Sequence, residues 1–261
     1  MLEINGLKVY DNGNQNGKTL LFVHGFPLTS NMWKYQTEYF IKDHRCITYD
    51  IRGLGNSSAG DGQFTMEYFV DDLIYIVNTL ELDKPILCGL SMGGYISLRA
   101  VEKYPQLFGG LILMDTRSEA DSNEGKLKRA AGIKRINEEG AMPFISDFVP
   151  NCFYKSSIER LGDKYISFLE EAKSNSAIGV KGSLLAMLSR TDTTEFLSQI
   201  EIPTLLICGE FDALTSPPVM KSMADKIPNS TFEVIPDCGH LSPYESGDKV
   251  NEVMDRFLLK L

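Results

Sequence analysis

The sequence predicts an α/β fold in which helices cover both faces of a mostly parallel, eight-stranded sheet, with a helical cap inserted after the sixth strand. Three observations carry this prediction. Short apolar runs alternate with segments of helical periodicity over most of the 261 residues, a pattern typical of parallel sheets. One such run leads through a glycine-bounded serine into a helical segment. Between residues 117 and 195 no strand-like run occurs, so this stretch interrupts the alternation.

The first four predicted strands lie before residue 50. Leu2–Ile4 and Leu7–Tyr10 flank Asn5-Gly6, a dipeptide that favours a tight hairpin turn. Thr19–His24 and Arg45–Tyr49 are short runs of β-branched and apolar residues. Runs of this kind are typical of strands that are buried on both faces.

The next four elements alternate between helix and strand. Thr65–Leu80 carries its apolar residues at helical spacing, and Pro85–Leu90 is a short apolar strand. Gly93–Tyr104 is the following helix and Gly110–Met114 another buried strand. In such units the carboxyl ends of the strands meet at one edge of the sheet, and ligands bind there.

The alternation resumes after residue 203. Pro203–Cys208 and Thr231–Ile235 are predicted strands, and Pro217–Ile227 is a helix between them. Lys249–Leu261 is the final helix, since its apolar residues fall on one face.

The stretch over residues 117–195 is the predicted cap. Apolar residues repeat at helical spacing in Leu127–Ile136 and in Ile158–Ala172, which indicates several helices. The predicted domains are therefore an α/β core, residues 1–116 and 196–261, and the inserted cap.

Composition narrows the possible functions. The formal charge is −9, and an acidic surface repels phosphate backbones, so no nucleic-acid partner is expected. No apolar run approaches the roughly 20 residues needed to span a bilayer, and the first residues lack the features of a signal peptide, so no membrane association is expected. Five widely spaced cysteines without a Cys-x-x-Cys pair favour a reduced, cytoplasmic protein. With three histidines in the chain, no multi-histidine metal site is expected.

The strongest chemical signal is Gly89-Leu90-Ser91-Met92-Gly93, a Gly-x-Ser-x-Gly pattern between a predicted strand and a predicted helix. In this setting the serine occupies a strained turn that lifts its hydroxyl above the sheet. The two glycines leave room for neighbouring backbone, and the helix N-terminus directs N–H groups toward negative charge. Ser91 is therefore the candidate nucleophile.

A serine nucleophile needs a base, and the base needs an acid to orient it. His240 lies in a loop after the last strand, and Asp212 lies just past the preceding strand. The resulting chain order of serine, acid and histidine is the order used by this kind of strand–serine–helix site. Asp237, three residues before His240, is the rival acid.

Hydrolysis through an acyl intermediate also needs hydrogen-bond donors for an oxyanion. The backbone N–H of Met92, directly after the nucleophile, is one expected donor, and the N–H of Phe26 in the loop after the Thr19–His24 strand is the other. His24 is expected to hold that loop through hydrogen bonds and not to take part in catalysis.

Several motifs together resemble the α/β-hydrolase superfamily, and the resemblance runs nearly from end to end of the chain. They are His24-Gly25-Phe26-Pro27, Asp50-Ile51-Arg52-Gly53-Leu54-Gly55-Asn56-Ser57, the Ser91 turn, Gly209-Glu210-Phe211-Asp212 and Gly239-His240. The resemblance implies that Ser91 is the nucleophile, His240 the base and Asp212 the acid. It also implies that Asp50 and Arg52 shape a loop and do not act as catalysts.

Within the superfamily, the cap length and the Asp115-Thr116-Arg117 segment resemble the branch of small-molecule esterases, oxoadipate enol-lactonases and cofactor-free haloperoxidases. Epoxide hydrolases and haloalkane dehalogenases carry an aspartate where this chain has Ser91, which argues against both. Because cofactor-free haloperoxidases also carry a proline in the loop of Pro27, secondary perhydrolysis is a further hypothesis.

The sequence thus predicts a serine hydrolase that cleaves a small carboxylic ester or lactone without a cofactor or metal. An enol-lactonase or carbon–carbon bond hydrolase with the same triad, and a slow-turnover ligand receptor of the same fold, remain as alternatives. The segment over residues 117–195 contains 12 basic and 12 acidic residues, and this balance predicts that the cap admits small uncharged acyl groups. The oligomeric state is not readable from the sequence.

Overall fold

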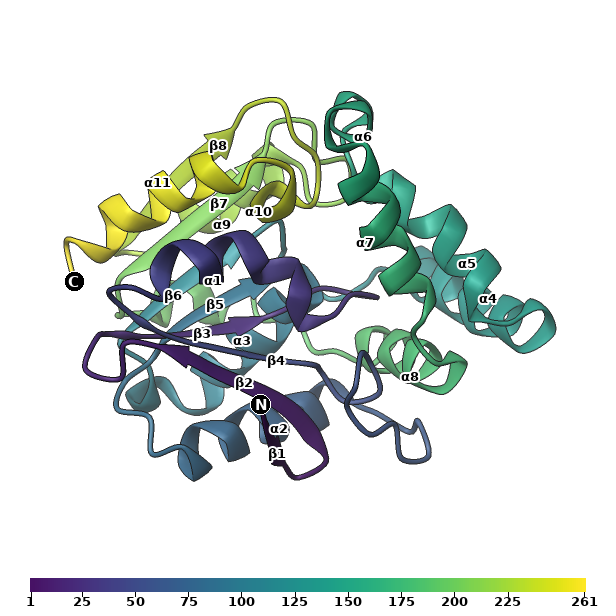
Figure 1. Ribbon diagram of the computed structural model, residues 1–261, viewed down its shortest axis with the longest axis horizontal. Helices are drawn as coiled ribbons and strands as arrows, with labels where there is room; N and C mark the ends of the chain where they lie inside the picture. The colour runs from purple at the N-terminus through teal and green to yellow at the C-terminus, as the bar shows by residue number, and fades with distance from the viewer.

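A single eight-stranded sheet forms the centre of the molecule in the computed structural model, which describes residues 1–261 (Figure 1). Its strands are β1 (Leu2–Ile4), β2 (Leu7–Gly13), β3 (Thr19–Val23), β4 (Arg45–Tyr49), β5 (Ile86–Leu90), β6 (Gly110–Met114), β7 (Thr204–Gly209) and β8 (Ser230–Ile235). Their order across the sheet is β1-β2-β4-β3-β5-β6-β7-β8. The pairs of β2 with β1 and β4 are antiparallel and the other pairs are parallel, so the predicted mostly parallel sheet is confirmed.

The strand sequences explain this arrangement. Every residue of β5, β6 and β7 is buried, as expected for continuous apolar strands that are covered on both faces. The β1–β2 hairpin turns through Asn5 and Gly6, both at positive φ, which is the geometry that this dipeptide favours.

The helices of the α/β core lie on both faces of the sheet, as the sequence predicts. They are α1 (Lys34–Phe40), α2 (Met66–Thr79), α3 (Met92–Lys103), α9 (Pro217–Ala224), α10 (Ser242–Glu245) and α11 (Gly247–Leu258). In Figure 1, α1 and α11 pack together in front of the strands, while α2 and α3 pack together behind them. The Thr65 hydroxyl caps α2 by accepting a hydrogen bond from Tyr68, so this helix begins where a capping residue stands.

Short 3₁₀ segments complete the core and the cap: η1 (Ser30–Trp33), η2 (Pro105–Leu107), η3 (Val149–Cys152) and η4 (Phe196–Gln199). Helix α10 was not expected from the sequence, because it is short and its polar and apolar residues do not give a clear helical period.

Five helices without any strand separate β6 from β7, which confirms the helical insertion after the sixth strand. They are α4 (Asn123–Glu139), α5 (Ala141–Phe148), α6 (Lys155–Leu161), α7 (Asp163–Lys173) and α8 (Ala177–Leu188). The teal and green ribbons of Figure 1 show them together at one end of the sheet. The apolar repeat over Ile158–Ala172 is not one helix, because Gly162 at φ 52° divides it into α6 and α7.

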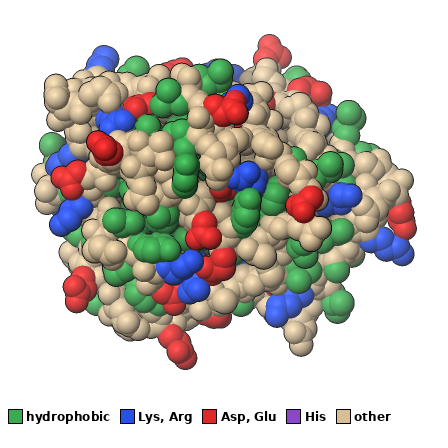
Figure 2. All heavy atoms as spheres, turned by 90° about the horizontal axis from the view of Figure 1, so that it is seen from below, with side chains coloured by type: hydrophobic (Ala, Val, Ile, Leu, Met, Phe, Trp, Pro, Cys, Tyr) green, Lys and Arg blue, Asp and Glu red, His purple; other side chains and the backbone are tan.

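On the face drawn in Figure 2, acidic and basic side chains are interspersed with small apolar groups, and no continuous basic field appears. No helix combines the length with the apolar character that crossing a bilayer requires.

Candidate active site

Ser91 lies at the sharp turn between β5 and α3, at φ 53° and ψ −115°. A positive φ is unfavourable for a serine, and the turn leaves no room for side chains beside it. A Cβ atom on Gly93 would clash with the carbonyl oxygen of Val23, and one on Gly89 would clash with Ser97 and with the Gly93 carbonyl. The two glycines of the motif are therefore required by close backbone contacts.

The structure brings Ser91, His240 and Asp212 into one hydrogen-bonded chain. The distance between Ser91 Oγ and His240 Nε2 is 2.8 Å, and that between His240 Nδ1 and Asp212 Oδ2 is 2.9 Å. His240 and Asp212 are buried, and their loops follow β8 and β7 at the edge where β5 also ends. This geometry lets the imidazole take a proton from the serine hydroxyl while the carboxylate orients the ring.

The surroundings of Asp212 keep its carboxylate ionised. The backbone N–H groups of Leu214 and Thr215 donate to Oδ1 at 2.8 and 2.9 Å, and the Thr215 hydroxyl donates to Oδ2 at 2.6 Å. Burial acts to raise the pKa of Asp212, but the charge of His240 and these hydrogen bonds outweigh burial and lower the pKa to about 2. Asp212 is therefore negatively charged at neutral pH, as an orienting acid must be.

Asp237, the rival acid, points elsewhere. It is exposed, has a φ of 59°, and its carboxylate takes part in no hydrogen bond. Its backbone carbonyl instead accepts hydrogen bonds from Ser157 and Arg160 of the cap. Of the favoured acid Asp212 and its rival Asp237, only Asp212 lies against His240.

The two expected oxyanion donors have free N–H groups. Neither the Phe26 nor the Met92 N–H donates to a backbone carbonyl in the turns, loops and helix caps of the protein, and Met92 is the first residue of α3. The first N–H groups of a helix have no acceptor of their own and attract negative charge. The pair is therefore available to an oxyanion formed at Ser91.

His24, Asp50 and Arg52 hold the loops beside the site, as expected. His24 is buried, and its Nε2 accepts a hydrogen bond of 2.9 Å from the Ile51 N–H. Asp50 accepts from backbone N–H groups of two loops, each at 2.9 Å. Arg52 forms a buried, bidentate ion pair with Asp72, in which Nη2 lies 2.6 Å from Oδ1 and Nε lies 2.8 Å from Oδ2. These contacts are structural and touch no reacting group.

Two residues beside the triad, Thr215 and Glu245, were not predicted from the sequence. The Thr215 hydroxyl lies 3.2 Å from His240 Nδ1 as well as next to Asp212, so it borders the acid–base contact. Thr215 lies three residues after Asp212, a spacing typical of a turn in which an aspartate accepts hydrogen bonds from nearby N–H groups. This spacing could have identified Thr215 from the sequence. Glu245 left no comparable signal, because it lies in the short helix α10.

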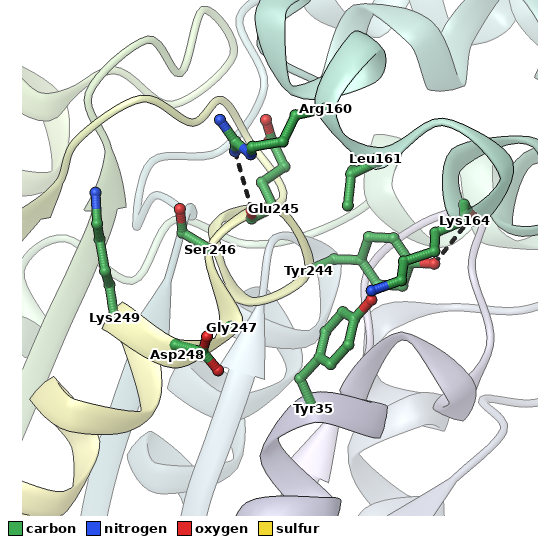
Figure 3. A pocket seen from close by; sticks show the side chains of 10 residues that line it. All are labelled: Tyr35, Arg160, Leu161, Lys164, Tyr244, Glu245, Ser246, Gly247, Asp248 and Lys249. Atoms are coloured by element: carbon green, nitrogen blue, oxygen red, sulfur yellow. Dashed lines mark hydrogen bonds between the residues drawn. The ribbon is translucent and has the colours of Figure 1, made fainter.

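Glu245 braces the loop that carries His240. Its buried carboxylate accepts hydrogen bonds from the N–H groups of Gly239 at 2.9 Å, Leu241 at 3.2 Å and the cap residue Tyr154 at 2.9 Å. Figure 3 shows a separate cavity that Glu245 also lines, where Arg160 of α6 donates to the Glu245 backbone carbonyl at 3.0 Å. Glu245 therefore ties the His240 loop to the cap.

Replacing Glu245 with glutamine is expected to lower kcat by about tenfold, since a small displacement of His240 weakens proton transfer. The amide keeps the side-chain shape but places an N–H group against N–H donors. The measurement is steady-state hydrolysis of a p-nitrophenyl ester, with KM and kcat determined separately. Glu252→Gln, an exposed glutamate on α11, is the matched control. Equal kinetics for the two variants would show that Glu245 does not position His240.

A cavity of about 370 Å³ opens over Ser91 and His240. Its apolar wall includes Phe26 of the core and Phe144 and Phe148 of α5, and the Phe26 ring lies 5.5 Å from that of Phe148. Core and cap thus both contribute to it. Among the methionines, Met187 lines this cavity, whereas Met92 and Met142 do not. Met92 is fully buried and Met142 is exposed on α5.

The nearest approach to a metal-binding cluster is formed by Asp115, Cys208 and Asp212. Asp115 is buried, and its oxygens accept hydrogen bonds from Gly209 and from the N–H and hydroxyl of Ser242, at 2.6–3.1 Å. The carboxylate oxygens of Asp212 are likewise engaged, by Thr215 and His240. The two carboxylates therefore hold neighbouring loops together through hydrogen bonds, and we assign no metal to this cluster.

Comparisons with known proteins show the family to which the chain is related. The sequence profile of the alpha/beta hydrolase fold family matches residues 18–246. The chain is 28% identical to 3-oxoadipate enol-lactonase 1 from Acinetobacter baylyi, over 97% of this chain and 92% of that protein. Its structure is similar to that of a thermophilic esterase from Thermogutta terrifontis solved with malate bound, with a TM-score of 0.93, 38% identity, and coverage of 97% of this chain and 93% of that chain. A bromoperoxidase from Bacillus anthracis is 25% identical with a TM-score of 0.86, covering 97% of this chain and 95% of that one.

Proposed function

The chain belongs to the alpha/beta hydrolase fold family, and within it we propose a serine hydrolase that cleaves small carboxylic esters or lactones. The observation that carries this proposal is the hydrogen-bonded chain from Ser91 through His240 to Asp212 beneath a cavity of about 370 Å³. The 38% identity to an esterase and the 28% identity to an enol-lactonase support the two bond types.

In the proposed reaction, His240 Nε2 removes the proton of Ser91 as its Oγ attacks the substrate carbonyl carbon. The N–H groups of Phe26 and Met92 bind the resulting oxyanion, where fixed donors stabilise developing charge. The carbon–oxygen bond to the leaving group then breaks, and His240 gives its proton to the departing oxygen. Asp212 stabilises the imidazolium in both steps.

The second half of the reaction repeats these steps with water. His240 takes a proton from a water molecule, whose oxygen attacks the acyl ester on Ser91. The tetrahedral intermediate collapses, Ser91 recovers its proton from His240, and the carboxylic acid leaves. In a lactone the leaving oxygen remains attached to the acyl group, so the product is a single hydroxy acid. No cofactor enters this scheme.

The size of the cavity predicts a preference for short acyl groups. About 370 Å³ is near the lower end of the roughly 300–1,000 Å³ found for small-molecule sites. We expect p-nitrophenyl butyrate to exceed the palmitate ester in kcat/KM by about tenfold or more, since the long chain loses contacts and adds strain. Release of p-nitrophenol measures this directly, and a panel of lactones tests the second bond type.

Two outcomes of that assay contradict the proposal. Faster hydrolysis of palmitate than of butyrate would indicate a lipase-like pocket. A single burst of product without further turnover would favour the slow ligand receptor of this fold. Sustained turnover of short esters or lactones supports the enzyme.

A further inference from the structure

The cavity over Ser91 has a basic lining, although the cap as a whole carries balanced charge. Arg117, Lys128 and Arg129 line it, and Asp121 is the one acidic side chain among its lining residues. The equal numbers of basic and acidic residues predicted uncharged acyl groups. That count averages over the outer faces of the cap helices, whereas a substrate meets only the side chains that face the cavity.

Three of these four charges are already paired with oppositely charged neighbours. Asp121 forms ion pairs with Arg129 and, at 2.8 Å, with Arg190, so its carboxylate is shared between two guanidinium groups. Burial acts to raise the pKa of Asp121, but these arginines outweigh burial and keep the pKa below its ordinary value. Lys128 pairs at 2.8 Å with Glu124 on the exposed side of α4.

Arg117 differs from the others because no carboxylate lies within ion-pair distance of it. One of its N–H groups donates to the Leu214 carbonyl oxygen, and its other donors have no hydrogen-bond partner in the protein. The residue is half-buried. A guanidinium that is partly removed from water and carries free donors matches a planar carboxylate, which accepts two parallel hydrogen bonds.

The position of Arg117 places this charge beside the reacting groups. It follows β6, which pairs with β5, the strand directly before Ser91. Its contact with Leu214 anchors the guanidinium to the loop between Asp212 and Thr215, and Thr215 borders His240. The side chain is therefore held against the loop that carries Asp212, and it faces the same cavity as Ser91.

We propose that Arg117 is a specificity-determining residue that binds a carboxylate on the substrate, so that the preferred substrate is an ester or lactone that also carries a carboxylate. A half-ester of a small dicarboxylic acid is one such molecule. The proposal rests on the proposed function for the bond that is cleaved. It further specifies that the substrate is negatively charged and that Arg117 binds this charge.

The first test compares two esters of the same shape and different charge. Ethyl hydrogen glutarate carries a carboxylate where ethyl 5-methylhexanoate carries an isopropyl group, and hydrolysis of both is followed by pH-stat titration. We expect the anionic ester to be preferred by about 10–100-fold in kcat/KM, the range for hydrogen bonds to a charged group. The ratio of the two values is the readout, since a general loss of activity cancels in it.

Variants identify the residue responsible. Arg117→Gln is expected to bring the ratio close to one, and Arg117→Lys to leave an intermediate ratio because it keeps the charge without the planar fork. Arg135→Gln removes the same charge from α4 outside the cavity lining, where Arg135 pairs with Glu139 at 2.8 Å and Asp147 at 2.7 Å. This control is expected to keep the ratio of the unmodified protein.

A binding measurement separates this proposal from the proposed function. Glutarate is titrated into the protein by calorimetry, and we expect its Kd to rise about tenfold or more in Arg117→Gln. Binding of glutarate through Arg117 without turnover of any ester would contradict the hydrolase and support the carboxylate site. Hydrolysis of both esters at similar rates, with a glutarate Kd that Arg117→Gln does not change, would overturn the carboxylate site and leave the hydrolase standing.

Discussion

Replacing Ser91 with alanine is expected to abolish hydrolysis and covalent labelling together. Ser91 Oγ lies 2.8 Å from His240 Nε2, whereas the Thr215 hydroxyl lies at the other ring nitrogen beside Asp212, so Thr215 does not take the place of Ser91 in the proposed acyl intermediate. Loss of a serine nucleophile lowers kcat by about 10⁴–10⁶ in enzymes that use this chemistry. The measurements are ester hydrolysis and reaction with a serine-directed fluorophosphonate, followed by mass spectrometry of the labelled peptide.

Ser198→Ala is the matched control for that experiment, because Ser198 is exposed and lies in η4, outside the cavity lining. It should keep both activity and labelling. Circular dichroism of each variant shows whether the fold is retained. Fluorophosphonate labelling that persists in Ser91→Ala would rule out Ser91 as the nucleophile.

Replacing Asp212 with asparagine is expected to lower kcat by about 10³–10⁴ with the fold retained. The amide has nearly the same shape, but it presents an N–H group or a weaker acceptor to His240 Nδ1, now 2.9 Å from Oδ2. It thereby favours the wrong imidazole tautomer and no longer stabilises the imidazolium. Steady-state kinetics measure the loss, and the Tm reports any accompanying loss of stability.

Asp237→Asn is the comparison for this second experiment and is expected to lower kcat by less than about tenfold. The Asp237 side chain is exposed and makes no hydrogen bond, while its backbone carbonyl contacts the cap regardless of the side chain. If Asp237→Asn loses most of its kcat while Asp212→Asn keeps a nearly normal kcat, Asp237 and not Asp212 is the acid that orients His240.

Much of the fold was predictable because its signals are local. Strands such as Gly110–Met114 are continuous apolar runs, and parallel strands buried on both faces leave few other arrangements. The Asn5-Gly6 turn and the Gly89 to Gly93 segment are short motifs whose backbone geometry follows from their own residues. Element ends were predicted less well, since a helix terminus such as that of α11 depends on contacts formed only after packing.

In the candidate site, too, some residues were predictable from local sequence and others only from the tertiary structure. The sequence by itself determined Ser91 and His240 as candidates, because the serine motif carries its own strained turn and the chain offers few histidines. Asp212 was also favoured over Asp237 in the sequence, but its contact with His240, the brace at Glu245 and the cavity-facing Arg117 are visible only in the tertiary structure. Each depends on where a loop directs a side chain relative to residues far away in the chain, such as the 28 positions that separate Asp212 from His240. Side-chain direction in loops follows from packing between elements, which no local pattern of residues encodes.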